Sequence, residues 1–231
     1  MKRPVSWHVS NRGASAIGAR RLGKRDIRMK LHWSPRSPFV RKVMITAHEL
    51  GLVDRLDCVR TVAAATKPHS ELMKDNPLSK IPTLVLDDGT VIFDSPVICE
   101  YLDRLNDKPK LFPTPLPERM IALRRQALGD GFLDFLLLWR NEQEREHPSQ
   151  VHLASYAERR RATLLALDRE AEALASSPFS IGHIAIGCAL SYLDFRFAAD
   201  DWRGGQPRIA AWHATFAKRP SVRATEPIDD L

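Results

Sequence analysis

The amino-acid sequence predicts two domains, an α/β domain of order βαβαββα followed by an all-α domain. Short apolar runs alternate with helix-like segments up to about residue 108, whereas only long helical periodicities follow residue 117. A proline-rich stretch separates the two parts. We therefore assign residues 29–108 to the first domain, 109–117 to a linker and 118–231 to the second domain.

In the first domain, the spacing of apolar residues distinguishes strands from helices. Short apolar runs bounded by Pro, Gly or Asp predict strands. Residues 39–50 carry one apolar stripe at helical spacing, with Gly51 at the C-terminal cap position. Asp88-Gly89 supplies the positive φ angles of a tight hairpin turn. The predicted order is strand 29–33, helix 39–50, strand 55–62, short helix 69–74, strands 81–86 and 91–93, and helix 95–105.

The second domain shows helical periodicity throughout. His147-Pro148, Ser177-Pro178 and Gly204-Gly205 interrupt it. The third helix is apolar on a wide face, which predicts that it forms the core of a helical bundle. The predicted helices are 118–146, 151–175, 181–199 and 206–218.

The net charge of +7 is confined to one end of the chain. Residues 1–28 hold eight Lys or Arg against the single acid Asp26, and the rest balances 27 bases with 27 acids. The folded part therefore offers no basic surface for nucleic acid, and no nucleic-acid partner is expected. We expect residues 1–28 to be a basic, disordered extension or to precede a start at Met29, the alternative being an organelle transit peptide.

No stretch is long and apolar enough to predict a membrane span, so no membrane partner is expected. Three widely spaced cysteines, without a C-x-x-C pair, predict neither a disulfide framework nor a zinc site. We expect buried thiols, a reducing cytoplasmic location and no metal.

Four motifs carry a family resemblance. They are Ser34-Pro35-Arg36-Ser37-Pro38-Phe39, Asn76-Pro77-Leu78-Ser79-Lys80-Ile81-Pro82, Phe93-Asp94-Ser95-Pro96 and Ile184-Ala185-Ile186-Gly187. In this order, residues 29 to about 227 resemble a glutathione transferase of the small bacterial type. The resemblance implies a thioredoxin-like first domain, glutathione as co-substrate, a small electrophile as second substrate, and a homodimer.

Ile81-Pro82 stands at the entrance of a predicted strand. Proline there leaves the amide and carbonyl of Ile81 free of the ladder. The resemblance implies a cis bond and pairing of Ile81 with the cysteinyl backbone of glutathione. The alternative is an ordinary proline at a strand entrance.

Asp94 and Ser95 stand where a strand passes into a helix, so we expect Ser95 to be the N-cap, with Pro96 at the first helical position. The resemblance gives Ser95 and the helix N-terminus the γ-glutamyl carboxylate, and Asp94 the ammonium. It also assigns Lys80 to the glycyl carboxylate, and it counts Phe39 among the glutathione-binding residues. A solvated lysine and a surface acid are the alternatives.

The chemistry that the resemblance implies requires glutathione as thiolate, although a free thiol has a pKa near 8.5. A serine hydroxyl lowers that pKa by donating to the sulfur, and the N-terminus of the following helix assists. Ser37 and Ser34 are the two candidates, and we prefer Ser37 because it directly precedes the helix. Ser37 also fits a plain N-cap, and both roles can hold.

The absence of cysteine at 34 and 37 disfavours thiol exchange. It favours conjugation of glutathione to electrophiles, or peroxidase, isomerase or dehalogenase chemistry. A non-catalytic binding protein of the same fold is the alternative. We expect Arg41 to be a solvated or paired surface residue. The candidate electrophile pocket, with core packing as the alternative for its aromatic members, is Arg36, Phe132, Phe135 and Trp139.

One position departs from the family pattern. The core helix of these transferases begins with a Ser/Thr-x-x-Asp capping box, and this chain has Ser180-Ile181-Gly182-His183. We expect Ser180 to cap the helix, and His183 not to accept from the Ser180 amide as a carboxylate does.

Overall fold

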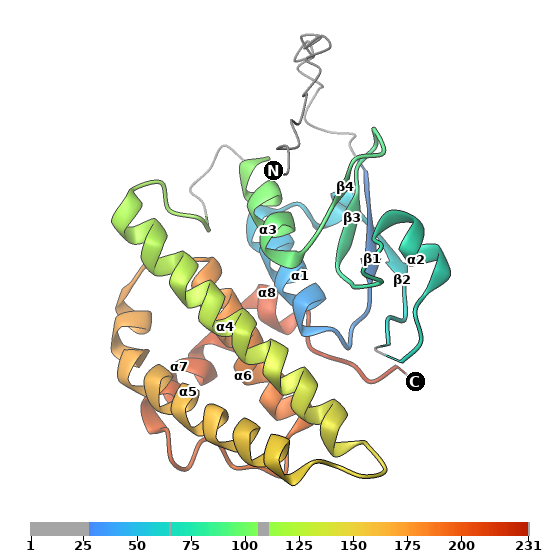
Figure 1. Cartoon of the computed structure of the whole chain (residues 1–231). Helices are drawn as coiled ribbons and strands as arrows, with labels where there is room; N and C mark the ends of the chain where they lie inside the picture. Colours follow the sequence, from blue (N-terminus) through green and yellow to red (C-terminus); the bar gives the residue numbers. More distant parts are fainter. Residues whose placement is uncertain (1–27, 65, 106–110, 231) are drawn as a thin grey trace, which may run out of the picture.

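The computed structural model describes residues 28–64, 66–105 and 111–230 (Figure 1). Almost all of the predicted extension, 1–28, and the start of the predicted linker therefore lie outside the described residues.

The first domain is built on a four-stranded mixed sheet. Its order is β2-β1-β3-β4, with β1 parallel to β2 and antiparallel to β3, and β3 antiparallel to β4. Leu31 pairs with Cys58 on one side and Leu84 on the other. The strands are β1 (Met29–Trp33), β2 (Leu56–Arg60), β3 (Thr83–Val85) and β4 (Val91–Ile92).

Three helices and one 3-10 turn complete the first domain. Helix α1 begins after its N-cap Ser37 and is capped at its C-terminus by Gly51. The φ of Gly51 is 66°, a left-handed conformation that glycine adopts without the steric cost of a Cβ. Helices α1 and α3 cover the face of the sheet toward the second domain, and α2 lies on the other side (Figure 1). The elements are α1 (Pro38–Leu50), η1 (Val53–Arg55), α2 (Ser70–Asp75) and α3 (Ser95–Arg104). The predicted βαβαββα order is confirmed.

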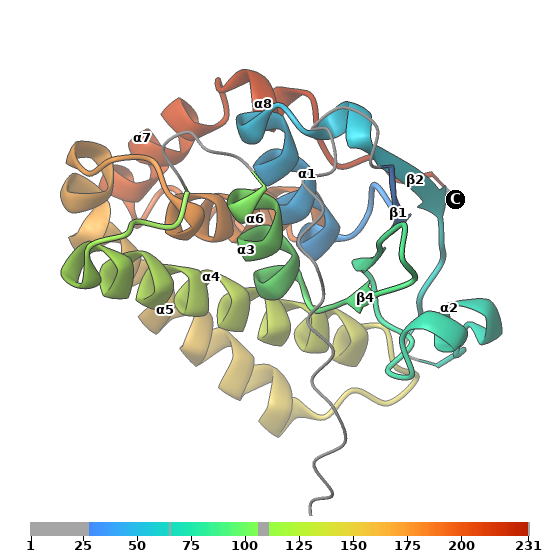
Figure 2. The ribbon, with the colours of Figure 1, turned by 90° about the horizontal axis from the view of Figure 1, so that it is seen from above.

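The second domain is helical, as predicted. Its core is α6, where every residue from Ile181 to Leu193 is buried. The long helices α4 and α5 run side by side across it (Figures 1 and 2). The helices are α4 (Leu116–Gln143), α5 (Gln150–Ser176), α6 (Ile181–Arg196), α7 (Pro207–Phe216) and α8 (Pro220–Arg223). None of those in the described part of the chain is long and apolar enough to cross a membrane.

Three details differ from the expectations. Helix α4 begins inside the predicted linker, because Pro117 falls in its first turn, where proline is tolerated. The four-residue α8 has no periodicity from which it could be predicted. The expectation for His183 is wrong, because its Nδ1 accepts from the Ser180 amide at 3.1 Å and completes a capping box.

Polar residues of α1 join the two domains. Lys42 is fully buried and donates to Asp130 of α4 at 2.5 Å. Arg41 was expected at the surface, but it is only 6% exposed and donates from Nη2 to the carbonyl of Val222 at 3.2 Å. The expectation failed because α6 and α8 pack on this side of α1.

Candidate functional site

Ser37 lies at the N-terminus of α1. Its hydroxyl oxygen accepts from the amide of Val40 at 3.3 Å, which makes it the N-cap. The hydroxyl proton is not used by this bond, so it is available to a ligand. Ser34 is buried, and its hydroxyl oxygen accepts a hydrogen bond from the backbone amide of Arg36 at 3.4 Å. Of the two predicted serines, Ser37 is the more accessible.

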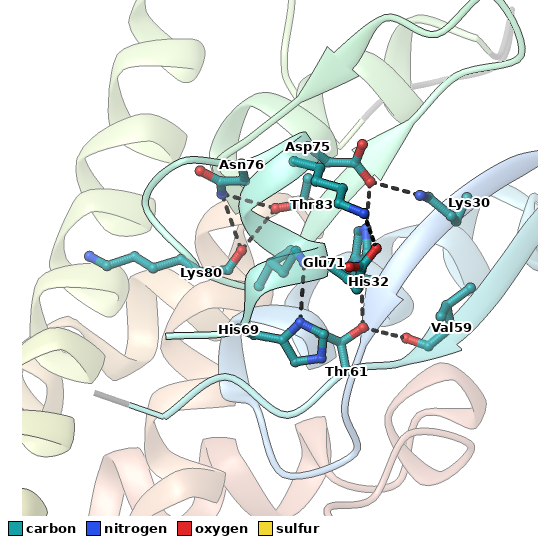
Figure 3. Close-up of polar contacts among 12 residues, drawn as sticks. Lys30, His32, Val59, Thr61, His69, Glu71, Asp75, Asn76, Lys80 and Thr83 are labelled. Carbon is teal, nitrogen blue, oxygen red and sulfur yellow. Dashed lines mark hydrogen bonds and ion pairs between the residues drawn. The ribbon is translucent and has the colours of Figure 1, made fainter. Parts of the chain in front are cut away.

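The loop between α2 and β3 carries Ile81-Pro82, whose peptide bond is cis. The buried residue Asn76 is 1% exposed, and its side-chain Nδ2 donates to the carbonyl of Lys80 at 3.1 Å and to the hydroxyl of Thr83 at 2.9 Å. Thr83 donates to the same carbonyl at 2.8 Å. Figure 3 shows these bonds closing the loop from inside, while the side chain of Lys80 extends away from them. Sequence reasoning missed Asn76.

Several groups of the loop and of the start of α3 have no partner in the part of the chain that the structure describes. The amide and carbonyl of Ile81 make no backbone hydrogen bond. Within the same residues, Lys80 and Asp94 form no ion pair and Ser95 makes no side-chain hydrogen bond. These are the groups that the sequence assigned to ligand binding.

The start of α3 differs from the expectation in its cap. Asp94 occupies the N-cap position without a side-chain capping bond, and Ser95 is the first helical residue. The prediction of Ser95 as N-cap is therefore wrong by one position. Ser95 is 2% exposed, and Asp94 is exposed.

A partly buried polar network joins β1 to the end of α2, beside the loop (Figure 3). The imidazole of His32, 6% exposed, contacts Asp75 at 2.8 Å through Nε2 and Thr61 at 3.0 Å through Nδ1. Lys30 donates to the same carboxylate at 2.7 Å. The hydrogen bonds from Lys30 and then His32 lower the pKa of Asp75. The network fixes the end of α2, from which the loop starts.

Two acids on α4 were not predicted. Burial raises the pKa of Asp130, and the nearby charge of Lys42 partly offsets this effect. Burial also raises the pKa of Asp134, with Lys80 and Lys42 lowering it and Asp94 raising it. The charges of Lys80 and Asp94 thus reach Asp134, so this turn of α4 faces the loop of the first domain.

The four predicted pocket residues differ in their surroundings. Arg36 contacts Asp229 through Nε at 3.0 Å. Phe132 and Trp139 are 2% and 6% exposed in the helical core, which leaves little of either to line an open pocket. Phe135 is half-buried, with its ring centroid 5.1 Å from that of Phe132.

Two of the three cysteines are buried, as expected, whereas Cys58 is exposed, and the large cavity lies apart from this site. Burial raises the pKa of Cys99 to about 11 and that of Cys188 to about 12, so both stay thiols at neutral pH. A cavity of about 660 Å³ opens between the end of α5 and α7 and contains none of the predicted residues. Among the described residues, no group of three or more His, Cys, Asp or Glu is placed to hold a metal.

Comparisons with known proteins agree with the arrangement. The family model "Glutathione S-transferase, N-terminal domain" matches residues 36–105. The GST-like protein YibF of Escherichia coli K12, described as uncharacterized, is 32% identical over 203 residues, covering 86% of this chain and 98% of YibF.

Two solved structures are similar over nearly the whole fold. A glutathione transferase family member from Pseudomonas fluorescens Pf-5, with bound glutathione, is 38% identical with a TM-score of 0.84, covering 87% of this chain and 100% of that chain. A glutathione S-transferase from Methylobacillus flagellatus KT, with glutathione bound, is 32% identical with a TM-score of 0.79 and the same coverage.

Proposed function

Because the chain belongs to the glutathione S-transferase family, we propose that it binds glutathione between α1, the Lys80–Pro82 loop and the start of α3. It then transfers the thiolate to a small hydrophobic electrophile. Glutathione is the co-substrate, and no metal takes part.

The observation that carries this proposal is the set of unpaired groups in the first domain. Glutathione has an extended backbone, two carboxylates and one ammonium. The free amide and carbonyl of Ile81 match that backbone, Lys80 matches the glycyl carboxylate, and Asp94 matches the ammonium. Ser95, at the N-terminus of α3, matches the γ-glutamyl carboxylate. We also assign Phe39, in the first turn of α1, to glutathione binding.

The hydroxyl of Ser37 supplies the activation. It donates to the glutathione sulfur while its oxygen keeps the bond from Val40. The positive end of the α1 dipole acts on the same sulfur, and each unit by which the thiol pKa falls corresponds to about 1.4 kcal/mol. The thiolate then forms a carbon–sulfur bond, and the electrophile loses its leaving group with the electron pair of the broken bond.

The oligomeric state and the contacts of the electrophile belong to the same proposal. We propose a homodimer, for which Val97 of α3 and Leu116 and Met120 of α4 offer exposed apolar contacts. Arg36 and Phe135 remain the candidates for contact with the electrophile. Glutathione-dependent peroxidase or isomerase chemistry uses the same thiolate and is tested in parallel.

The test combines binding with turnover. Glutathione affinity, the ultraviolet absorbance of the bound thiolate against pH, and conjugation of a general aryl halide are measured for wild type, Ser37→Ala and Ser34→Ala. We expect Ser37→Ala to bind glutathione, to raise its thiol pKa and to lose most conjugation, with a smaller effect of Ser34→Ala. Binding without turnover of any aryl halide, peroxide or isomerisable substrate would support the non-catalytic alternative. An unchanged thiol pKa in both variants would reject the serine assignment.

A further inference from the structure

Arg41 is a buried cation whose charge is not matched by a hydrogen-bonded acid. Its side chain is 6% exposed, and only Nη2 has a partner, the Val222 carbonyl at 3.2 Å. Nε and Nη1 are buried without a hydrogen-bond partner in the described residues. Buried donors without a partner are unfavourable, and more so when the group is charged. A buried guanidinium of this kind calls for a ligand.

A small cavity adjoins Arg41. It has a volume of about 10 Å³, enough for one atom of about the size of a water molecule. It is lined by residues from the N-terminus of α1, from α6 and from the C-terminal segment, among them Ser37, Arg41, Cys188 and Tyr192. Arg41 therefore borders a space that a monatomic ligand can fill.

The polar side chains of the lining can donate hydrogen bonds, whereas its three prolines cannot. Besides Nε and Nη1 of Arg41, the hydroxyls of Ser37 and Tyr192 can donate, because their oxygens accept from Val40 and Arg140 and their protons are not used by these bonds. Cys188 stays a thiol, because burial raises its pKa to about 12. A water needs acceptors for its own two protons, whereas an anion needs donors only. The lining therefore favours an anion over water.

The positive charge at the cavity comes from Arg41 and from the start of α1. The N-terminus of the 13-residue α1 contributes the positive end of its dipole. Arg36 also borders the cavity, paired with Asp229 at 3.0 Å. Glu226 and Asp194 act on Arg41 through space, and neither lines the cavity or forms an ion pair with Arg41 among the described residues. We propose that the cavity between Ser37 and Arg41 binds one small monoanion of the halide class.

The experiment uses the full chain without glutathione, so it is independent of the proposed function. Thermal unfolding is followed while sodium chloride replaces sodium gluconate at constant ionic strength. We expect a saturable rise of the melting temperature in wild type, because an anion that binds only the folded state stabilises it. The rise should disappear in Arg41→Gln and persist in Arg159→Gln, which removes an exposed charge of α5. Equal curves for chloride and gluconate in wild type, or an undiminished rise in Arg41→Gln, would overturn the proposal.

A second measurement covers the case in which Arg41→Gln does not fold. Wild-type crystals grown in bromide are examined by anomalous diffraction. We expect a bromide peak within hydrogen-bond distance of the Arg41 guanidinium. A water molecule or no density at this position would show that the cavity is not an anion site.

Discussion

His183 accepts a hydrogen bond from the backbone amide of Ser180 through Nδ1, at 3.1 Å. Its Nε2 lies 3.0 Å from the carbonyl of Leu174, which fixes the tautomer with the proton on Nε2. A neutral imidazole thus takes the place of the capping-box carboxylate, and its second nitrogen links α6 to the end of α5 by a hydrogen bond.

The first prediction tests this cap. His183→Ala removes the acceptor of the Ser180 amide and leaves the Leu174 carbonyl with only the Ser177 hydroxyl, at 3.4 Å. We therefore expect a loss of about 1–3 kcal/mol in the free energy of unfolding. His183→Asp restores an acceptor for the amide and should recover part of the loss. Urea unfolding measures both, with His147→Ala as control because that side chain is 91% exposed. A loss in His147→Ala equal to that in His183→Ala would contradict the cap.

The second prediction concerns acid stability. Burial lowers the pKa of His213 to about 4, with Asp194 opposing this shift and Arg203 and Arg41 adding to it. Burial also lowers the pKa of His183, with the Leu174 carbonyl opposing and Arg125 and Arg219 adding. The unfolded chain binds these protons near pH 6.5 and the folded chain only at lower pH. The contribution of these two histidines to the free energy of unfolding is therefore complete above pH 6.5 and is lost as the pH drops toward 4.

Chemical unfolding at several pH values measures this loss. For His213 alone, the shift corresponds to a contribution on the order of 3 kcal/mol, lost across that window. Replacing His213 by Gln removes the titrating group, so the free energy of unfolding should depend less on pH between 6.5 and 4. An unchanged slope in His213→Gln would assign the acid sensitivity to other groups.

The cap also shows what the sequence could predict. Ser37 before Pro38 and Gly51 after the apolar stripe fixed both ends of α1, because these are local signals. The absence of an acid at 183 is visible in the sequence, but the role of His183 as a neutral acceptor depends on the carbonyl of Leu174, nine residues away. Local patterns therefore predicted the elements better than the partners of polar side chains.

The same limit applies to the site. The loop residues Lys80 and Ile81 were found from a motif. Lys42 and Arg41 stand on α1 next to its apolar stripe, and nothing nearby in the sequence indicates that Asp130 and Val222 come to meet them. Asn76 belongs to the same motif, but the sequence gives no sign that its side-chain amide bonds across the loop. Such contacts become visible only when the helices are placed.

The third prediction concerns Asn76 as a positioning residue. Asn76→Ala removes the donor to the Lys80 carbonyl and to Thr83, so the loop loses its fixed shape. We expect a several-fold rise in KM for glutathione with a smaller change in kcat, because Asn76 acts through Lys80 and Ile81 and not on the sulfur. Asn76→Asp keeps the acceptor for the amide of Leu78 but not the donor, and should behave like the alanine variant. An unchanged KM in a folded Asn76→Ala protein would refute the positioning role.

The fourth prediction uses two glycines of α4 that differ only in their surroundings. A Cβ built on Gly129 would lie 2.5 Å from the carbonyl carbon of Ala185 and 2.7 Å from the amide nitrogen of Ile186. Backbone atoms of α6 cannot give way as a side chain does, so Gly129→Ala should destabilise by about 1–3 kcal/mol or more. Gly131, two residues on, has nothing within 4 Å of its Cβ position.

Gly131→Ala is therefore the matched control. It gains helix propensity without a clash, and we expect it to stabilise by about 0.5–1 kcal/mol. Thermal and urea unfolding of the two variants should shift in opposite directions from wild type. Equal shifts would mean that α4 and α6 do not approach at Gly129 as described. Asp130, on the same turn as Gly129, accepts from Lys42 of the first domain. Gly129→Ala should therefore also disturb this interdomain bond, and weaken glutathione binding with it. Gly131→Ala should leave both unchanged.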